Sequence, residues 1–431
     1  MTFQDIKNLF FKFGSKEVVL LIWTILAILY FSHTLPGEHN HDYGGHLEYS
    51  HIIASKKALP KPHDGWQTYH PPLYYLINNF LAPSIIKNKA NHIDYVRIFS
   101  LIYGFITIWI MGWFLEKLNI PPFHRFLSLL YICTVPKFMM IFSTYNNDSF
   151  VTMLLVASTV LSYRLYLEWN KNLAILLLLV STAALYTKYS AVICMGVLIL
   201  ICGKDLIKLR LPGYAERKVL AVLFSSLILF SPWVYFHNYK ETHKLFPNNT
   251  EHGLGSDLAI DDDRPVIDTI IRLPFSLSRG SHEWDDPWAH GYSRPESKKH
   301  NYWAFCFITS LFSENVYEKP GVNLVWLMFW LNLVIVLLGL SRIKKTSLTK
   351  LAALFIGLAH LAHITLLLSM EHPAACTMDY RYLSWSWIAW AVLYSDLLSE
   401  KSELSRVFSK LLIVAVILHS YTLIVLFGNG T

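Results

Sequence analysis

The residues of this sequence best suited to chemistry are charged side chains at the ends of long apolar stretches. They are Asp42, Arg97, Lys137, Asp148, Lys188, Asp379 and Arg381. Lysine and arginine offer positive charge and hydrogen-bond donors to phosphate oxygens, and an aspartate beside them suits a general base. Each residue alone also fits a structural ion pair or an interface anchor. Because charge inside a membrane is costly, the group as a whole indicates a functional cavity.

Histidines and acids in the segment before residue 50 suggest metal binding as a second chemistry. A divalent cation could be held by His39, His41, Asp42 and His46, with Glu48 close by in sequence. Imidazole and carboxylate groups are common metal ligands. The His-x-His spacing has no second matched half, however, so the alternative is a polar interfacial loop whose histidines lie at headgroup level.

A third candidate lies in the aromatic and acidic run Trp284-Asp285-Asp286-Pro287-Trp288. Aromatic rings stack on the faces of sugars, and carboxylates accept hydrogen bonds from sugar hydroxyl groups. Trp284 is therefore a candidate for substrate binding. The alternative is an aromatic belt at the membrane interface.

The elements that position these residues are apolar helices. Hydrophobic residues make up 54% of the chain and charged residues 16%, with a mean hydropathy of +0.37; soluble domains carry nearer ~25% charged residues. Spans of about 20 residues are predicted at 17–35, 93–115, 124–142, 149–167, 172–187, 189–203, 218–236, 322–341, 350–370, 382–398 and 410–427. The prediction is a single all-α membrane domain over 1–431, with about eleven spans.

The distribution of lysine and arginine predicts how these spans are oriented. The loops 204–217 and 342–349 are rich in basic residues, which places them in the cytoplasm. The N-terminus is then inside and the C-terminus outside. The two long loops, 36–92 and 237–321, lie outside. The segment 46–58 is predicted to form a short amphipathic helix that lies on the membrane. The segment 303–312 is apolar but too short to span, and we expect a re-entrant or membrane-lying helix that covers the cavity.

The sequence resembles the GT-C superfamily of membrane glycosyltransferases, in the branch that uses polyprenyl-phosphate sugars and includes aminoarabinose transferases and protein O-mannosyltransferases. The resemblance depends on an acid after the first span, a Pro-Pro-Leu-Tyr-Tyr element, an Asn-Asp pair and two weaker motifs. They are His41-Asp42-Tyr43, His70 to Tyr75, Asn147-Asp148, Thr187-Lys188-Tyr189 and Asp379-Tyr380-Arg381-Tyr382. The order of the motifs and their shared side of the membrane agree with the family over nearly the whole chain.

The resemblance implies transfer of a sugar, with inversion, from a lipid-linked phosphate donor to an acceptor outside the cytoplasm. Asp42 would be the catalytic base, and Lys188 and Arg381 would hold the donor phosphate. Lys137 and Arg97 are further candidates for contact with the phosphate. The candidates for substrate binding are His46, His70, Tyr74, Asp148, Trp284 and Asp379.

The chain departs from the family at the first acidic site. Many relatives have Asp-Glu there, whereas Tyr43 follows Asp42 in this sequence. Glu48 is the next acid, so either Glu48 or a histidine such as His46 takes the place of the second acid.

A transporter or flippase of lipid-linked sugars is the alternative function. Such a carrier would concentrate polar residues at mid-membrane and often contains an internal repeat, which is not found here. The expected location is the bacterial inner membrane, with the site facing the periplasm. The expected partners are the lipid-linked donor and a protein, lipid or glycan acceptor, with no nucleic acid.

Overall fold

The computed structural model describes residues 15–34, 42–82, 93–203, 213–247, 266–271, 302–312, 321–341, 346–369 and 375–426. All regular structure in these ranges is helical, as the sequence predicts. The longer helices are α2 (Ser15–His33), α6 (Ile93–Lys117), α9 (Asn147–Leu167), α10 (Lys171–Leu185), α13 (Tyr214–Trp233), α18 (Gly321–Leu340), α19 (Ser347–Ser369) and α21 (Glu403–Tyr421). The shorter ones are α3 (Tyr43–Lys56), α4 (Leu73–Leu81), α7 (Pro122–Thr134), α8 (Pro136–Ser143), α11 (Ser190–Cys202), α14 (Lys240–Thr242), α15 (Val266–Ile271), α17 (Tyr302–Phe312) and α20 (Trp387–Ser399).

Non-α segments extend three of these helices. A π-helical stretch, η1 (Val234–Tyr239), continues α13, and η7 (Thr422–Leu426) continues α21. Two 3₁₀ segments, η5 (Ala375–Met378) and η6 (Tyr380–Ser386), precede α20. The segment η6 carries Arg381.

Several helices are long and apolar enough to cross a membrane, as expected of a multi-pass membrane protein. Within the described ranges there are six of them, or seven if the bent pair α7 and α8 forms one span. Many large apolar side chains on these helices face outward, among them Leu21, Ile228, Leu361 and Ile417. A soluble protein rarely exposes so much contiguous apolar surface, whereas lipid tails would cover it.

The predicted count of eleven spans is not confirmed. The helices α10 and α11 are apolar but shorter than a span of this kind requires, and within α18 the stretch Leu327–Leu340 counts as a shorter apolar helix. The segment predicted at 382–398 starts as the 3₁₀ helix η6 and becomes α-helical only at Trp387. The helices α10, α11 and α20 are shorter than the ~20 residues that cross a bilayer as a straight helix.

The span predicted at 124–142 is also not one straight helix. It is divided into α7 and α8, whose axes differ by 67°. The break falls at Val135, directly before Pro136. Proline has no backbone N–H and disfavours helical geometry in the preceding residue. The same proline fits the first position of the new helix, so Lys137 lies in the first turn of α8.

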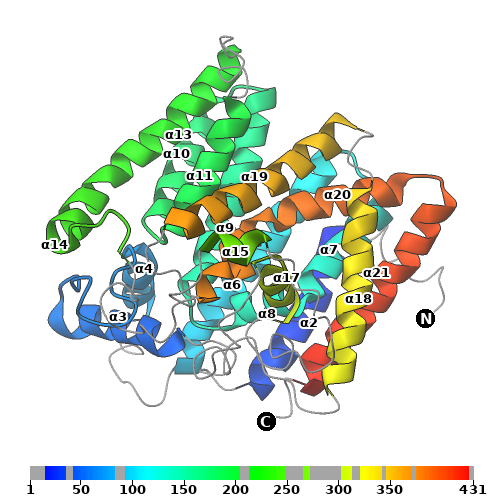
Figure 1. Cartoon of the computed structure of the whole chain (residues 1–431), viewed down its shortest axis with the longest axis horizontal. Coiled ribbons are helices and arrows are strands. Elements are labelled where there is room, and N and C mark those ends of the chain that lie inside the picture. Colours follow the sequence, from blue (N-terminus) through cyan, green and yellow to red (C-terminus); the bar gives the residue numbers. More distant parts are fainter. Residues whose placement is uncertain are drawn as a thin grey trace.

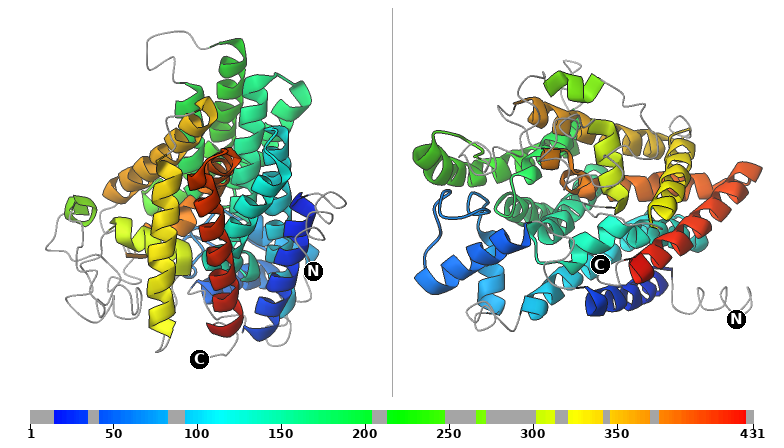
Figure 2. Two further views of the ribbon diagram at one scale, coloured as in Figure 1. Left: turned by 90° about the vertical axis from the view of Figure 1, so that its right-hand side faces the viewer. Right: turned by 60° about the horizontal axis from the view of Figure 1, so that its bottom comes forward.

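The helices form one bundle in which the first described helix, α2, contacts the last described segment, η7 (Figure 1). The C-terminal helix α21 packs against α18 and α7, and η7 contacts α2. The left view of Figure 2 shows α18 and α21 as roughly parallel rods. Close packing of α2 on α6 requires a glycine, because a β-carbon at Gly104 would lie 2.6 Å from Trp23 Cη2.

The short helices predicted in the two long loops are present as α3 and α17. Helix α3 packs on α4, where the rings of Tyr49 and Tyr75 stack with centroids 3.8 Å apart. Ser50 Oγ and the Tyr145 hydroxyl share a hydrogen bond that fastens α3 to the turn before α9. The start of α3, which carries Asp42, is therefore held against the bundle.

Candidate functional site

Three ion pairs join segments that are distant in sequence at one end of the bundle. They are Asp42–Arg381 at 2.6 Å, Lys188–Asp148 at 2.6 Å and Lys137–Asp379 at 2.8 Å. Lys188, Asp148, Lys137 and Asp379 are nearly inaccessible to solvent, and the first pair is partly buried. The charged residues that the sequence predicts near one face are thus grouped in space.

Asp42 immediately precedes α3, and its carboxylate faces η6. One carboxylate oxygen accepts a hydrogen bond from Arg381 Nη1, and the other accepts one from Trp66 Nε1 at 3.3 Å. Burial raises the pKa of Asp42, but the positive charges of Arg381 and Lys188 outweigh burial and hold this pKa well below its usual value. Asp42 is therefore ionised at neutral pH.

Arg381 is positioned by a second acid. Asp379 caps η6 by accepting a hydrogen bond from the Arg381 backbone N–H at 2.6 Å, and its other oxygen pairs with Lys137 Nζ. Lys137 therefore supports the segment that carries Arg381. The guanidinium of Arg381 lies 5.3 Å from the ring centroid of Tyr382, and Lys188 Nζ lies 5.1 Å from the same centroid. Two cations thus share one aromatic ring.

Lys188 lies in the turn between α10 and α11, and hydrogen bonds hold this turn against the first loop. The Leu73 N–H donates to Tyr186 O at 2.9 Å, and the Tyr189 hydroxyl donates to Tyr69 O at 2.7 Å. Asp148, in the first turn of α9, accepts a hydrogen bond from Lys188 Nζ. The turn therefore brings a cation beside the segment that begins with Asp42.

Two buried histidines flank Asp42, and their rings stack with centroids 6.2 Å apart. His46 Nδ1 shares a hydrogen bond of 2.7 Å with the Tyr75 hydroxyl. Burial lowers the pKa of His46 to about 4 and places the pKa of His70 well below its ordinary value, with the charge of Lys188 adding to the effect at His70. Both imidazoles are neutral at pH 7.

A cavity of about 440 Å³ opens beside these groups. Asp42, His70, Lys188 and Arg381 are among its lining residues. Apolar residues of α11 and α19 also line it, including Val192, Ile193, Gly196, Leu200, Leu366 and Leu367. Charged and apolar groups in the lining of one cavity suit a lipid whose headgroup is anionic.

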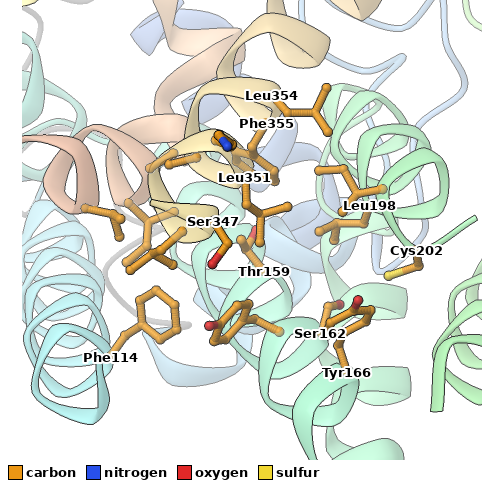
Figure 3. Close-up of a pocket in the computed structure, with 18 of the residues that line it drawn as sticks. Phe114, Thr159, Ser162, Tyr166, Leu198, Cys202, Ser347, Leu351, Leu354 and Phe355 are labelled. Atoms are coloured by element: carbon orange, nitrogen blue, oxygen red, sulfur yellow. The ribbon is translucent and has the colours of Figure 1, made fainter. Parts of the chain in front are cut away.

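A second cavity, of about 520 Å³, is lined by the opposite ends of α9, α11 and α19 together with α6 and α20 (Figure 3). Leu198, Leu351 and Phe355 are among its lining residues. Leu351 and His363, which lines the first cavity, are separated along α19 by roughly 18 Å, at 1.5 Å per residue. The walls of this second cavity are mostly apolar, and the three ion pairs lie away from it.

The structure separates the predicted site residues into two groups. Of the predicted set, Asp42, His70, Lys188 and Arg381 line the charged cavity. The other predicted residues in the described ranges do not line this cavity and contact neighbouring protein groups. They are Glu48, His46, Tyr74, Arg97, Lys137, Asp148 and Asp379. Glu48 is exposed and accepts a long hydrogen bond from the Trp66 N–H at 3.4 Å. Trp284 lies outside the described residues.

The proposed metal ligands are only partly described. His39 and His41 lie outside the described ranges. Among the residues that the structure describes, no group of three histidines, cysteines or acids could hold a metal ion. Asp42 and His46 are engaged by Arg381 and Tyr75, so these two residues bind protein groups in this structure.

Arg97 has the geometry of a structural residue. It is 1% exposed and donates hydrogen bonds to Ser143 O, Thr34 O and Thr34 Oγ1 at 2.8 to 2.9 Å. Its guanidinium also lies 4.4 Å from the centroid of the Phe31 ring. These bonds connect the ends of α2, α6 and α8.

Replacing Arg97 by methionine is expected to lower the free energy of unfolding by at least about 2 kcal/mol, because carbonyl groups would lose charged donors. Any activity measured per folded molecule should stay near the wild-type value. Arg164→Met is the matched control, since the guanidinium of Arg164 lies 5.8 Å from the Trp113 ring centroid and such a contact contributes only ~0.5–1 kcal/mol. Unfolding in detergent measures the free energy of unfolding of both variants. Loss of activity at an unchanged free energy of unfolding would contradict a purely structural role for Arg97.

Several lining residues were not predicted from the sequence. They are Trp66, Gln67, Tyr69, Tyr189, Phe246, His363 and Tyr382. Except for His363, these side chains are uncharged at neutral pH, so a search for charged residues in the sequence does not find them. Most are immediate sequence neighbours of Asp42's partners or of His70, Lys188 and Arg381, and this adjacency is the signal that could have identified them.

A comparison with protein-family models found none that matches this chain, and a comparison with curated proteins found no match.

Proposed function

We propose that this protein is an inverting glycosyltransferase of the GT-C type, which moves a sugar from a polyprenyl-phosphate donor to an acceptor. The observation that supports the proposal most is the cavity in which Asp42 faces Arg381 and Lys188 while α11 and α19 provide an apolar wall. A base, two cations and a hydrocarbon surface are what this reaction needs in one place.

In this proposal the donor phosphate binds between Lys188 and Arg381. Both side chains line the cavity and share the ring of Tyr382. Arginine can offer two parallel donors to a phosphate, and lysine adds a point charge. The isoprenoid chain lies along the apolar wall past Gly196, where the structure has no atom within 4 Å of the position of a β-carbon.

The reaction exchanges one bond at the anomeric carbon. The acceptor oxygen attacks this carbon from the face opposite the phosphate, and the bond from the carbon to the phosphate oxygen breaks with its electron pair. The acceptor proton passes to Asp42. Polyprenyl phosphate leaves with one more negative charge, which Arg381 and Lys188 stabilise.

The Asp42–Arg381 pair suggests how the donor prepares the base. A carboxylate held by a guanidinium is a weak base, since the positive charge lowers its pKa. A donor phosphate competes with Asp42 for the same guanidinium. As negative charge grows on the leaving phosphate, Arg381 turns toward it, and Asp42 becomes more basic while the proton arrives.

The remaining parts of the proposal concern topology. Eleven spans are proposed, with the N-terminus inside, the C-terminus outside and the charged cavity facing the periplasm of a bacterial inner membrane. The basic loops 204–217 and 342–349 support this orientation. Short helices such as α10 and α11 would then cross as tilted or paired elements.

Transfer from a panel of synthetic polyprenyl-phosphate sugars tests the proposed function. Purified full-length protein should release polyprenyl phosphate and yield an acceptor product of inverted configuration. A chelator added in parallel tests for a metal requirement. Binding and translocation of the donor with its glycosidic bond intact, under all acceptor conditions, would favour a flippase over a transferase.

Replacing Gly196 by leucine is expected to lower kcat/KM for a long-chain donor roughly tenfold or more, because a bulky side chain in a filled groove costs ~1–3 kcal/mol. A donor with a short prenyl chain should be less affected. Gly357→Leu is the matched control, since Gly357 also has open space at its β-carbon but is exposed on α19 and lies outside the cavity. Equal losses with long and short donors would place the chain elsewhere.

A further inference from the structure

The segment Trp66–His70 carries two buried polar atoms on residues that line the charged cavity. Gln67 is 2% exposed and His70 is 6% exposed, and both line the cavity. Gln67 Oε1 and His70 Nδ1 have no hydrogen-bond partner in the structure. A buried polar atom without a partner is costly, so two such atoms from one short segment indicate that a ligand completes their hydrogen bonds.

The backbone of Trp66–His70 is held by hydrogen bonds within the loop and by hydrogen bonds from the hydroxyl groups of two tyrosines. Thr68 Oγ1 accepts from the Gly65 N–H at 2.9 Å, and the His70 N–H donates to Gln67 O at 3.1 Å. The Tyr49 hydroxyl donates to His70 O at 3.1 Å. The Tyr189 hydroxyl binds Tyr69 O. The polar atoms of Gln67 and His70 therefore stand on a preorganised scaffold.

Aromatic rings stand around these polar atoms. Trp66, Tyr69 and Tyr189 all line the same cavity. Trp66 Nε1 also donates to Asp42, which places this indole beside the residue proposed as the base. Rings beside hydrogen-bonding groups of this kind suit a sugar ring, which has apolar faces and a polar edge.

The charged groups around the cavity favour a neutral sugar over a charged one. Asp42, Asp148 and Asp379 are each engaged in an ion pair. The groups that Trp66–His70 presents are an amide oxygen, a neutral imidazole and aromatic rings. Among the described lining residues, every acid that could bind an ammonium group on the sugar is already in one of these ion pairs. A carboxylate on the sugar would compete with the phosphate for Lys188 and Arg381.

We propose that Trp66–His70 is the subsite for the donor sugar, and that the sugar is neutral, with hydroxyl groups bound by Gln67 and His70. This inference depends on the proposed transferase function. Gln67 Oε1 accepts a hydrogen bond from one hydroxyl, and His70 Nδ1 bonds a second. The subsite discriminates against amino sugars and uronic acids.

The test compares a sugar-bearing donor with bare polyprenyl phosphate in the full-length protein. Gln67→Met and His70→Phe should each raise the donor KM roughly tenfold, the equivalent of one lost hydrogen bond of ~1.4 kcal/mol. Inhibition by bare polyprenyl phosphate should stay within about twofold, and this inhibition also reports that the variants are folded. His51→Phe is the matched control, because His51 Nδ1 also has no partner but His51 lies outside the cavity.

Several results would overturn the inference without touching the transferase proposal. One is an unchanged donor KM in both variants, another is an equal loss of affinity for bare polyprenyl phosphate, and a third is a change confined to the acceptor KM. A wild-type preference for an amino-sugar or uronic-acid donor would also overturn it. If the wild-type protein neither binds nor cleaves any donor of the panel, the proposed function fails first and the subsite fails with it.

Discussion

Asp42→Asn protein is expected to transfer sugar 10²–10⁴-fold more slowly than the wild type, the usual contribution of a general base. Asparagine has the size of aspartate and can still accept the hydrogen bond from Trp66 Nε1, but it cannot take the acceptor proton. Donor binding should persist, because Lys188 and Arg381 remain. Single-turnover release of polyprenyl phosphate measures the chemical step directly. Full activity in this variant would remove Asp42 from the mechanism.

Two controls separate this chemical effect from a structural one. Asp42→Asn leaves the partly buried Arg381 without its counterion, so some loss of stability is expected. The double variant Asp42→Asn/Arg381→Gln removes both charges, and it should regain stability without regaining transfer. Asp64→Asn changes an exposed carboxylate in the same loop, which binds the Lys61 N–H, and it should transfer sugar at the wild-type rate.

Arg381→Gln is expected to lower kcat roughly 10²–10³-fold, as does the loss of one group that stabilises charge in a transition state. The effect should appear in kcat more than in KM, since the extra negative charge exists only as the phosphate leaves. Arg381→Lys keeps the charge but loses the paired donors, so an intermediate rate is expected. An unchanged kcat in Arg381→Gln would show that another group receives the phosphate charge.

The pH profile gives an independent readout of the same variant. In the wild type, the pKa of Asp42 is held well below its usual value and that of His46 is about 4. The acid limb of kcat/KM, which reports the free enzyme, should therefore lie near or below pH 4. A carboxylate base loses activity as the pH falls through its pKa. Without Arg381, burial dominates and raises the pKa of Asp42, so the acid limb should move to higher pH.

The lengths of the apolar runs were sufficient to predict the helical class and the approximate positions of the long helices that the structure describes. They were less informative about helix length. The apolar run from 172 to 203 was predicted as two spans, but the turn at Thr187-Lys188 leaves α10 and α11 short. The bend at Pro136 was available from the sequence, because proline inside an apolar run breaks a helix.

Charge type and position led to the prediction of Asp42, Lys188 and Arg381 as site residues, and the family motif led to His70; the structure places all four in the lining of one cavity. Which residues neutralise one another was beyond the sequence, since Lys137 and Asp379 are separated by 242 positions. Pairing of this kind changes the interpretation of Lys137 from a phosphate ligand to a support for Arg381. Gln67 was not predicted because it is uncharged. The argument for Gln67 depends on its burial and on its oxygen without a hydrogen-bond partner, and both are properties of the fold.

The Asp42–Arg381 contact joins residues that are 339 positions apart. During synthesis, Asp42 leaves the ribosome long before Arg381 is made, and chains emerge at ~5–20 residues per second. The charged cavity is therefore absent for most of the time that the protein spends entering the membrane. No N-terminal portion that ends before η6 contains both members of the pair. The cavity that Asp42 and Arg381 line can therefore be completed only after η6 has been made and has packed against the segment that carries Asp42.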